Sequence, residues 1–510
     1  MENRMRGPYR APRVCWMFRI NGLSVEPIIG LETHVQLATR TKMFCDCPVG
    51  SGSEPNSRIC PVCLGLPGSL PVINRHAVEL AIRVALALRC QVARVTAWDR
   101  KSYFYPDLPK NYQISQYARP LATCGVFEFP FDGRYSRVRI ERAHLEEDAG
   151  KSTHDQDGTT TIDLNRAGTP LLEIVSCPDI HSSVEARAFT VQVQRLVRYL
   201  GVSEANMQEG QLRFEPNINV RIHTNGHRYA TPIVEVKNLN SFRALQGTID
   251  HEITRQVTEW QQTGQTAVPG NKSNRGWDEK RGVTVPQREK EEPHDYRYFP
   301  DPDLVPLTTD PTWVAELKDS MLELPVARAA RLAHEYKVKT ADAPSLVDDR
   351  PTADLLDHAA EAGGDKPTLA KHFLSFWAHY AHERHTTIGA LGISPGRLAE
   401  LANLVADGRL SATAAAQVAK TMLTCHEPPS AVATRLGLLQ SHDEGQIGAW
   451  VDEVLAANQR AVQDAINNRK KRQASRSFLA GQVMRRSRGR ADPRIVSDLI
   501  EQKLGEFARP

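Results

Sequence analysis

The hydrophobic rhythm of the chain changes once, near residue 310, and this change limits the folds that are open to it. From about Ile28 to Leu307, short alternating apolar and polar runs are broken by Gly, Pro, Asn and Asp, which is typical of strands. From about Pro311 onward, Ala, Leu, Glu and Arg recur at helical spacing, as in AWVDEVLAANQRAVQDAI. The sequence therefore predicts an α+β protein, in which a β-rich antiparallel part precedes helical parts.

The length of the chain requires more than one hydrophobic core, because cores stop growing at roughly 250–300 residues and this chain has 510. A helix stop at Asp407 and Gly408 divides the helical part. We expect an N-terminal extension, disordered or the product of a mis-called start, at 1–27, a β-rich domain at 28–310, a helical domain at 311–407 and a helical tail at 408–510. The polar, aperiodic stretch from Gln261 to Pro293 is predicted to be a long mobile loop.

Composition excludes several classes of protein. Charged residues make up 24% of the chain, and no apolar run approaches the roughly 18 residues that a membrane span needs. The apolar stretch from Val14 to Phe18 is too short for a signal peptide, and nine cysteines are too few for a disulfide scaffold. These features predict a cytoplasmic protein. The net charge of +4 is small, so any binding of nucleic acid must come from a local basic patch.

Several predicted strands carry polar side chains on one face. In LETHVQL, alternation places Glu32 and His34 on the same side, and in TPLLEIVS Glu173 interrupts an apolar face. Similar faces follow in EPNINVRI and PIVEVKN, and an acidic run occupies residues 146–148. If these segments converge, they form an oxygen-rich basin suited to Mg²⁺ and phosphate. The alternative is an antiparallel sheet with one solvated face, although a lone carboxylate such as Glu173 on an apolar strand is costly.

A phosphate-binding loop at EDAGKST is excluded by its spacing. The glycine that such a loop needs five positions before Gly150 is replaced by Leu145.

Four cysteines cluster in two short pairs. Cys45 and Cys47 form a C-x-C pair, and Cys60 and Cys63 form a C-x-x-C pair after a short loop. Two thiolate pairs predict a closed, structural, tetrahedral Zn²⁺ site. The alternative is two incidental pairs of buried thiols.

A dense basic segment lies near the C-terminus. Phe478, Leu479, Val483 and Met484 are interleaved with its charges, so we expect a folded helix with a cationic face that binds a phosphate backbone. The alternative is an ordinary solvated helix surface. The residues that we predict to contact nucleic acid are Arg469, Lys470, Lys471, Arg472, Arg476, Arg485, Arg486 and Arg488.

Seven segments together resemble one family along the chain from about Ile28 to the C-terminus. They are IGLETHVQL, PGSLPVINRHAVELAIR, DRKSYFYPDLPKNYQISQY, HLEEDAGKSTH, DLNRAGTPLLEIVS, VKNLNSFRAL and DYRYFPDPDLVPL. In this order and spacing they are similar to the B subunits of the aspartyl/glutamyl-tRNA(Asn/Gln) amidotransferases, the GatB/GatE family. The resemblance implies a β-rich cradle domain with a kinase-like site, a helical domain and a helical tail that grips tRNA.

The resemblance also implies an activity and partners. Such proteins use ATP and Mg²⁺ to phosphorylate the side-chain carboxylate of Glu-tRNA(Gln) or Asp-tRNA(Asn), and ammonia then displaces phosphate. The ammonia comes from an amidase A subunit, and a small C subunit completes a heterotrimer. Which misacylated tRNA is used stays open. By motif position, Glu32, His34, Glu147 and Glu173 take the metal and catalytic roles, and Lys101 supplies a cation.

Two positions depart from the family pattern. Gln208 stands where an acid is usual, and Glu215 stands where Asp is usual. Two other interpretations remain alongside the main one. The first is the archaeal-type GatE protein, which has an inserted synthetase-like domain, and for which this chain is short. The second is a non-catalytic, zinc-containing tRNA-binding protein, against which Glu32, His34, Glu147 and Glu173 argue.

Overall fold

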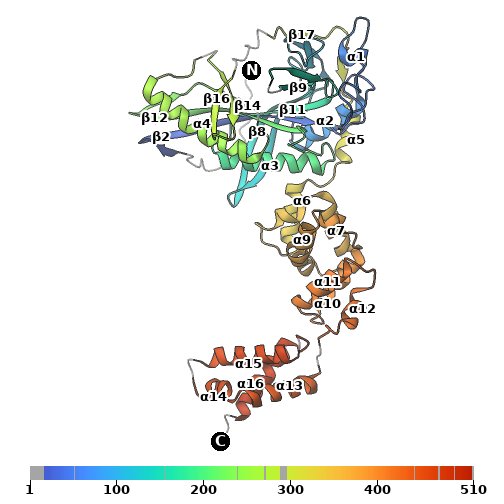
Figure 1. The fold of residues 1–510 in the computed structure, drawn as a ribbon, viewed down its shortest axis with the longest axis vertical. Helices are drawn as coiled ribbons and strands as arrows, with labels where there is room; N and C mark the ends of the chain where they lie inside the picture. The colour runs from blue at the N-terminus through green and yellow to red at the C-terminus, as the bar shows by residue number, and fades with distance from the viewer. Residues whose placement is uncertain are drawn as a thin grey trace, which may run out of the picture. The chain divides into compact units, whose positions relative to one another are not determined.

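The protein is described by a computed structural model over residues 17–50, 52–154, 157–237, 239–268, 271–287, 296–440, 443–468, 471–487 and 489–507. It divides into two compact units, of which the first ends at Leu324 and the second begins at Pro325 (Figure 1). The first unit carries all the named strands of the described residues, and the second is helical. The predicted α+β class is confirmed.

One large mixed sheet forms the first unit. Within the described residues it has eleven strands, in the order β16-β15-β14-β12-β2-β11-β8-β7-β3, with β1 paired to β2 and β13 paired to β12. The pairs are antiparallel as predicted, apart from the parallel pair of β14 and β15. The strands are β1 (Phe18–Ile20), β2 (Leu23–Gln36), β3 (Gln91–Val92), β7 (Ala122–Phe131), β8 (Arg134–Glu147), β11 (Pro170–Ser176), β12 (Leu212–Thr224), β13 (His227–Ala230), β14 (Val234–Lys237), β15 (Ser273–Asp278) and β16 (Val283–Pro286).

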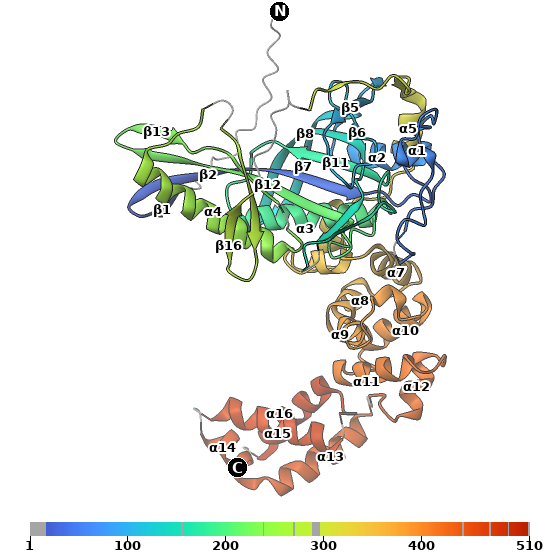
Figure 2. The same ribbon diagram turned by 45° about the horizontal axis from the view of Figure 1, so that its top comes forward.

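Helices cover one face of this sheet. Ile218 and Val220 of β12 alternate with polar residues and share the main core with Leu245 and Ile249 of α4, so the apolar side of the strand faces that helix. Figures 1 and 2 show α3 and α4 lying along the same face. The helices of this unit are α1 (Pro61–Leu64), α2 (Arg75–Ala87), α3 (Ser183–Tyr199), α4 (Phe242–Thr263) and α5 (Pro311–Asp319).

Three small sheets complete the first unit. Lys101 lies on the central strand of the sheet β17-β5-β6, which is paired on one side through Phe299 and on the other through Gln113. The small strands are β4 (Val95–Thr96), β5 (Asp99–Ser102), β6 (Tyr112–Ser115), β9 (Lys151–His154), β10 (Thr160–Asp163), β17 (Phe299–Pro300) and β18 (Leu307–Thr308).

The second unit consists of short helices, and none of the helices among the described residues is long and apolar enough to cross a membrane. Its α-helices are α6 (Pro325–Glu335), α7 (Arg350–Glu361), α8 (Lys366–His372), α9 (Ala378–Glu383), α10 (Pro395–Ala406), α11 (Ala412–Met422), α12 (Pro429–Arg435), α13 (Glu444–Ala457), α14 (Gln459–Asn467), α15 (Arg472–Arg486) and α16 (Pro493–Phe507). Short 3₁₀ turns lie at Ala343–Val347 and Ile388–Ala390, and a π-turn lies at Phe373–Trp377.

Two sequence predictions about irregular segments are contradicted over the residues that the structure describes. Residues 18–20 and 23–27 of the supposed extension belong to β1 and β2, where Val25 is fully buried, while residues 1–16 lie outside the described part. The supposed loop from Gln261 holds the end of α4 and the hairpin of β15 and β16; residues 269–270 and 288–295 lie outside the described part. Its strands are short, and they are stabilised by pairing of β15 with β14 and of β16 with β15, which local periodicity does not reveal.

Two predicted domain boundaries also differ from the divisions in the structure. Helix α5 follows residue 310, but its Trp313 and Leu317 pack on the core of the first unit, so that unit ends at Leu324. The division at Asp407 falls inside a packed group, because Tyr380 donates to the Ala416 carbonyl at 2.9 Å and Ser430 donates to Glu400 at 3.0 Å. A separate core begins later, at Ile447.

Candidate active site

The strand register aligns the polar residues into rows on the face of the sheet that is opposite α4. Glu173 of β11 pairs with His144 of β8 on one side and with His34 of β2 on the other. Glu32 of β2 pairs with Glu215 of β12. Because directly opposite residues point to the same face of a sheet, these side chains gather from neighbouring strands. The predicted convergence is therefore present in the fold.

The first group consists of His34, Glu146 and Glu173, whose ligand atoms lie within 4.8 Å of one another. His34 Nε2 is 3.6 Å from Glu146 Oε1 and 3.6 Å from Glu173 Oε2, and His144 Nε2 lies 3.2 Å from the same Glu173 oxygen. Both His34 and His144 keep a buried Nδ1 atom without a hydrogen-bond partner among the described residues. Two carboxylates and an imidazole so close together form a donor set that fits a divalent ion.

The charges of this group shift the pKa values of its members in different directions. Burial lowers the pKa of His34, but the hydrogen bond and charge of Glu173, together with Glu146, outweigh burial and raise it to about 9. Burial and the neighbouring Glu173 raise the pKa of Glu146. Burial acts in the same direction on Glu173, but His144 and His34 hold its pKa well below the usual value. The two carboxylates are therefore chemically distinct.

A second group of carboxylates adjoins the first. Glu32, Glu215 and Glu235 have oxygen atoms within 4.8 Å of one another. Asn217 donates to Glu32 at 2.9 Å, and Lys237 Nζ lies 3.5 Å from both Glu215 and Glu235. This second group thus already contains a cation from the protein.

Lys101 reaches the same site from the small sheet, where tyrosines surround its ammonium group. Its Nζ atom lies 4.8 Å from the ring centre of Tyr296 and 5.7 Å from that of Tyr103. The segment that carries Tyr296 is held by Arg100, whose guanidinium is 2.8 Å from both Asp301 and Asp303. Lys101 is therefore a positioned cation, and the alternative of an ordinary exposed lysine does not fit its partly buried setting.

Two cavities meet at these residues. The smaller cavity, of about 390 Å³, is lined by Glu32, His34, Lys101, Glu146 and Glu173. The larger cavity, of about 820 Å³, extends toward the loop before β12. Glu215 and Lys237 line both cavities, and both volumes lie in the range of small-molecule sites.

The structure does not bring Glu147 to the carboxylate group, which corrects the sequence prediction. Glu147 forms a buried ion pair with Lys110 and accepts a hydrogen bond from the Ile114 amide at 2.9 Å. Glu146 and Glu147 are neighbours on β8, so they point to opposite faces of the sheet. The acidic run showed that a carboxylate faces the site, but only the strand register shows that it is Glu146.

The two departures from the family pattern lie in different places. Gln208 is exposed on the wall of the larger cavity, and it is not a member of either carboxylate group. Glu215 belongs to the second group, where its oxygen lies close enough to Glu32 and Glu235 to share an ion. The Asp-to-Glu departure therefore leaves a carboxylate in the basin, and the neutral Gln208 removes no charge from these two groups.

The four predicted cysteines come together. The sulfur atoms of Cys45, Cys47, Cys60 and Cys63 all lie within 4.8 Å of one another, and Cys60 and Cys63 are separated by 3.9 Å. Tetrahedral Zn²⁺ with bonds of about 2.3 Å separates its sulfurs by about 3.8 Å. A hydrogen bond from Cys45 lowers the pKa of Cys63 to about 4, although burial opposes this. The site is compatible with structural zinc.

Helix α15 forms in the predicted basic segment, and its Leu479 and Val483 are buried in the last core. Several of its charges are engaged within the domain: Arg476 lies 3.0 Å from Glu501, and Arg486 lies 2.7 Å from Glu453. The described residues of the predicted set are Lys471, Arg472, Arg476, Arg485 and Arg486, whereas Arg469, Lys470 and Arg488 lie outside the described part.

Comparison with known proteins agrees with this architecture. Residues 27–315 match the GatB/GatE catalytic domain, and residues 354–504 match the GatB domain. The chain belongs to the GatB/GatE family. It is 41% identical over 486 residues to the B subunit of the aspartyl/glutamyl-tRNA(Asn/Gln) amidotransferase of Carboxydothermus hydrogenoformans, a match that spans 94% of this chain and 99% of that protein. The B subunits of Moorella thermoacetica and Rhodopirellula baltica are 42% and 43% identical, over 94% and 93% of this chain and 100% and 96% of their own.

The GatB/GatE resemblance located most of this site, but it did not identify every residue there. His144, Glu146 and Glu235 were not predicted as catalytic or metal-binding residues. Glu235 lies in the predicted polar strand PIVEVKN, Glu146 lies in the acidic run, and His144 lies in the motif HLEEDAGKSTH. Tyr296 and Tyr298 lie in the motif DYRYFPDPDLVPL, which carried the resemblance without any role for its tyrosines. Strand parity places His144 and Glu146 on the same face, because they are two residues apart.

Proposed function

We propose that the chain is the component of a tRNA-dependent amidotransferase that activates the side-chain carboxylate of a misacylated tRNA, Glu-tRNA(Gln) or Asp-tRNA(Asn), for amidation. Membership of the GatB/GatE family supports this activity, and the relatives, which are named as B subunits, support a role as one component of a larger enzyme. The observation that carries the proposal is the row of His144, Glu173 and His34 beside Lys101, at the meeting point of two cavities.

The reaction begins with phosphoryl transfer from ATP. An oxygen of the substrate carboxylate attacks the γ-phosphorus, the bond to ADP breaks, and an acyl phosphate forms. Such transfers depend on positioning and charge neutralisation, and they need no nucleophile from the protein. In this proposal Lys101 neutralises the developing negative charge, and the tyrosines around it limit access of water to the ammonium group.

Mg²⁺, when bound with the nucleotide, neutralises phosphate oxygens during transfer. Glu146, Glu173 and His34 are the residues that would hold it, since their ligand atoms lie together on the wall of the smaller cavity. Glu32 and Glu215, which face each other across β2 and β12, line the same cavity. In the second step, ammonia attacks the acyl carbon, phosphate leaves, and the side-chain amide forms.

The remaining parts of the proposal concern the partner subunits, the tRNA and the structural metal ion. We infer that an amidase A subunit supplies ammonia and that a small C subunit completes the enzyme, because the names of the relatives describe one component of a multi-subunit amidotransferase. The basic surface of α15 is proposed to bind the tRNA phosphate backbone. The four-cysteine group is proposed to hold Zn²⁺ as a structural ion.

The test is reconstitution of the enzyme. The chain is co-expressed with the A and C subunits, and conversion of Glu-tRNA(Gln) and Asp-tRNA(Asn) is measured with ATP and glutamine. Formation of Gln-tRNA or Asn-tRNA, with release of ADP and phosphate, supports the proposal and identifies the substrate. Tight tRNA binding without ATP consumption would overturn it, and would favour a non-catalytic tRNA-binding protein.

A further inference from the structure

A lysine without a predicted role reaches the site from the segment that was predicted to be a loop. Lys272 directly precedes β15, and its Nζ atom lies 2.8 Å from Glu235 Oε2. The Glu235 side chain is completely buried, whereas the Lys272 side chain remains 38% exposed and lines the smaller cavity. Lys272 therefore joins a buried carboxylate to a cavity that is open to ligand.

Glu235 is approached by more than one cation, within a group of three carboxylates. Two ammonium groups approach this carboxylate, since Lys237 Nζ lies 3.5 Å from it and contacts Glu215 at the same distance. An ammonium group has three donors, and the bond to Glu235 uses one donor of Lys272. The other donors point away from Glu235, as the tetrahedral geometry of an ammonium group requires, and the exposed part of the side chain lies on the cavity wall.

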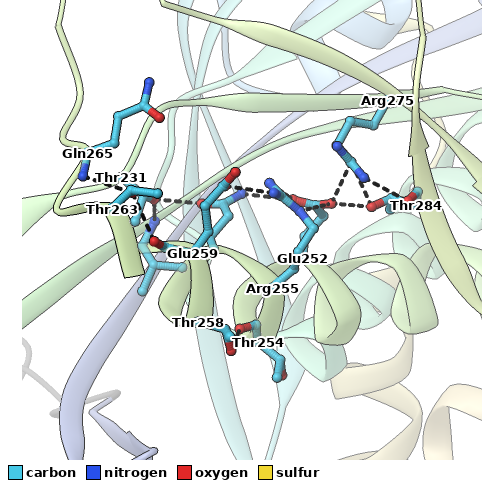
Figure 3. A network of polar contacts seen from close by, with 12 residues as sticks. Thr231, Glu252, Thr254, Arg255, Thr258, Glu259, Thr263, Gln265, Arg275 and Thr284 are labelled. Atoms are coloured by element: carbon cyan, nitrogen blue, oxygen red, sulfur yellow. Dashed lines mark hydrogen bonds and ion pairs between the residues drawn. The ribbon is translucent and has the colours of Figure 1, made fainter. Parts of the chain in front are cut away.

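A buried polar network holds β15, the strand that directly follows Lys272. Glu252 of α4 is completely buried, and it contacts Arg255 at 2.9 Å and Arg275 of β15 at 3.3 Å (Figure 3). Arg275 also donates to the hydroxyl and carbonyl oxygens of Thr284 on β16, at 2.9 and 2.8 Å, and Thr284 donates in turn to Glu252. The network thus ties both strands of the hairpin to α4.

This network determines which face of the sheet receives Lys272. Side chains alternate along a strand, and a slip of one residue moves each of them to the opposite face. Arg275 points toward α4, and Lys272, three positions earlier, points to the site. Trp277 also packs toward α4, opposite Gly247, where a Cβ atom would lie 3.2 Å from the indole. Buried ionic groups rarely add stability over apolar packing, but they do specify register.

We propose that Lys272 is a substrate-binding residue that contacts a phosphate oxygen of the nucleoside triphosphate, and that the Glu252–Arg275 network is the device that positions it. The inference rests on the proposed function. Phosphate is favoured over the substrate carboxylate, because Lys272 shares Glu235 with Lys237, which lines both cavities, whereas Lys101 lies among the tyrosines. An ammonium group at this junction suits the phosphate chain of a nucleotide whose base occupies the larger cavity.

The first test compares Lys272→Met with Lys280→Met in the reconstituted enzyme. Lys280 is exposed in the turn of the same hairpin and serves as the matched control. Loss of one charge-assisted hydrogen bond raises the KM for ATP about tenfold. We expect that increase for Lys272→Met alone, with the KM for misacylated tRNA unchanged, and a parallel increase in the inhibition constant of inorganic tripolyphosphate but not of AMP.

Equal ATP kinetics in the two variants would overturn the proposal and leave Lys272 as a structural partner of Glu235. An increase confined to the KM for tRNA would also overturn it, because Lys272 would then contact the aminoacyl end. Absence of ATP-dependent amidation in the unmodified enzyme is a different result, since it refutes the proposed function before any variant is compared.

The second test addresses the positioning network. Arg275→Gln is expected to raise the KM for ATP as Lys272→Met does, and Arg275→Lys to restore part of the loss. The double variant Lys272→Met/Arg275→Gln should have no larger KM than Lys272→Met alone, because the network acts through Lys272. Additive increases would show that the network affects the site by another route, and would overturn that part of the proposal.

Discussion

Glu215 lies directly opposite Glu32 across the β2–β12 pair, so two carboxylates lie side by side on the polar face. Like charges that face each other across strands are destabilising. Asn217 and Lys237 offset part of this repulsion, through contacts of 2.9 Å to Glu32 and 3.5 Å to Glu215. Such an arrangement costs stability, and its place on the wall of a cavity agrees with a role in binding cations and phosphates.

Substitution of Glu146 should lower the activity, whereas substitution of Glu147 should lower the stability. Glu146→Gln is expected to lower the rate of side-chain phosphorylation by roughly 100-fold, since it removes a charge from the His34 and Glu173 group. Glu147→Gln should instead lower the free energy of unfolding by about 3 kcal/mol, because it leaves the buried Lys110 ammonium unpaired. Single-turnover kinetics and urea unfolding of both variants test this. The reverse assignment of effects would return Glu147 to the catalytic group.

The four-cysteine group should bind one zinc ion per chain. Cys60→Ser is expected to remove that zinc and to lower the free energy of unfolding by about 3 kcal/mol or more, because metal binding contributes directly to folding. Elemental analysis and thermal unfolding provide the measurements. Cys124→Ser, at an exposed cysteine outside the group, is the control and should change neither quantity. A full metal content in the Cys60 variant would contradict the assignment.

His372 should make the second unit sensitive to acid. Burial lowers the pKa of His372 to about 4, against an ordinary value of 6.5. Between these values the unfolded chain binds a proton that the folded unit does not, so stability falls as the pH decreases from about 6.5 to 4. The loss is at most on the order of 3 kcal/mol.

Thermal unfolding at pH 7.5 and at pH 5 measures this effect. His372→Gln should flatten the difference between the two conditions, whereas His382→Gln, at an exposed histidine, should preserve it. An unchanged pH dependence in the His372 variant would assign the acid sensitivity to other groups.

The tail should carry a salt-dependent part of tRNA binding. Replacing Lys471, Arg472 and Arg485 with Ala is expected to weaken tRNA binding and to reduce the slope of log K against log salt by about 0.7 to 0.9 for each lost phosphate contact. Lys420→Ala, at an exposed lysine of α11, should leave the slope unaltered. Filter binding at several salt concentrations measures it, and the same slope in the triple variant would exclude this face of α15.

Local patterns in the sequence determined much of this architecture. Alternation with a period of two identified the polar faces of β2, β11, β12 and β14, because neighbouring side chains of a strand must point to opposite sides. Helical spacing identified the second unit, and the spacing of the cysteines identified a group of four thiols. These features depend on residues that are close together in the chain, and so they can be predicted without knowledge of the fold.

The tertiary structure decided what depends on pairing between distant segments. Register placed Glu146, rather than Glu147, beside His34 and Glu173, and it brought Glu235 to Glu32. The segment that follows Lys272 has little intrinsic strand character. It forms a strand because it pairs with β14 and because Arg275 forms an ion pair with the buried Glu252 of α4. Such contacts join residues far apart in sequence, so no local periodicity records them.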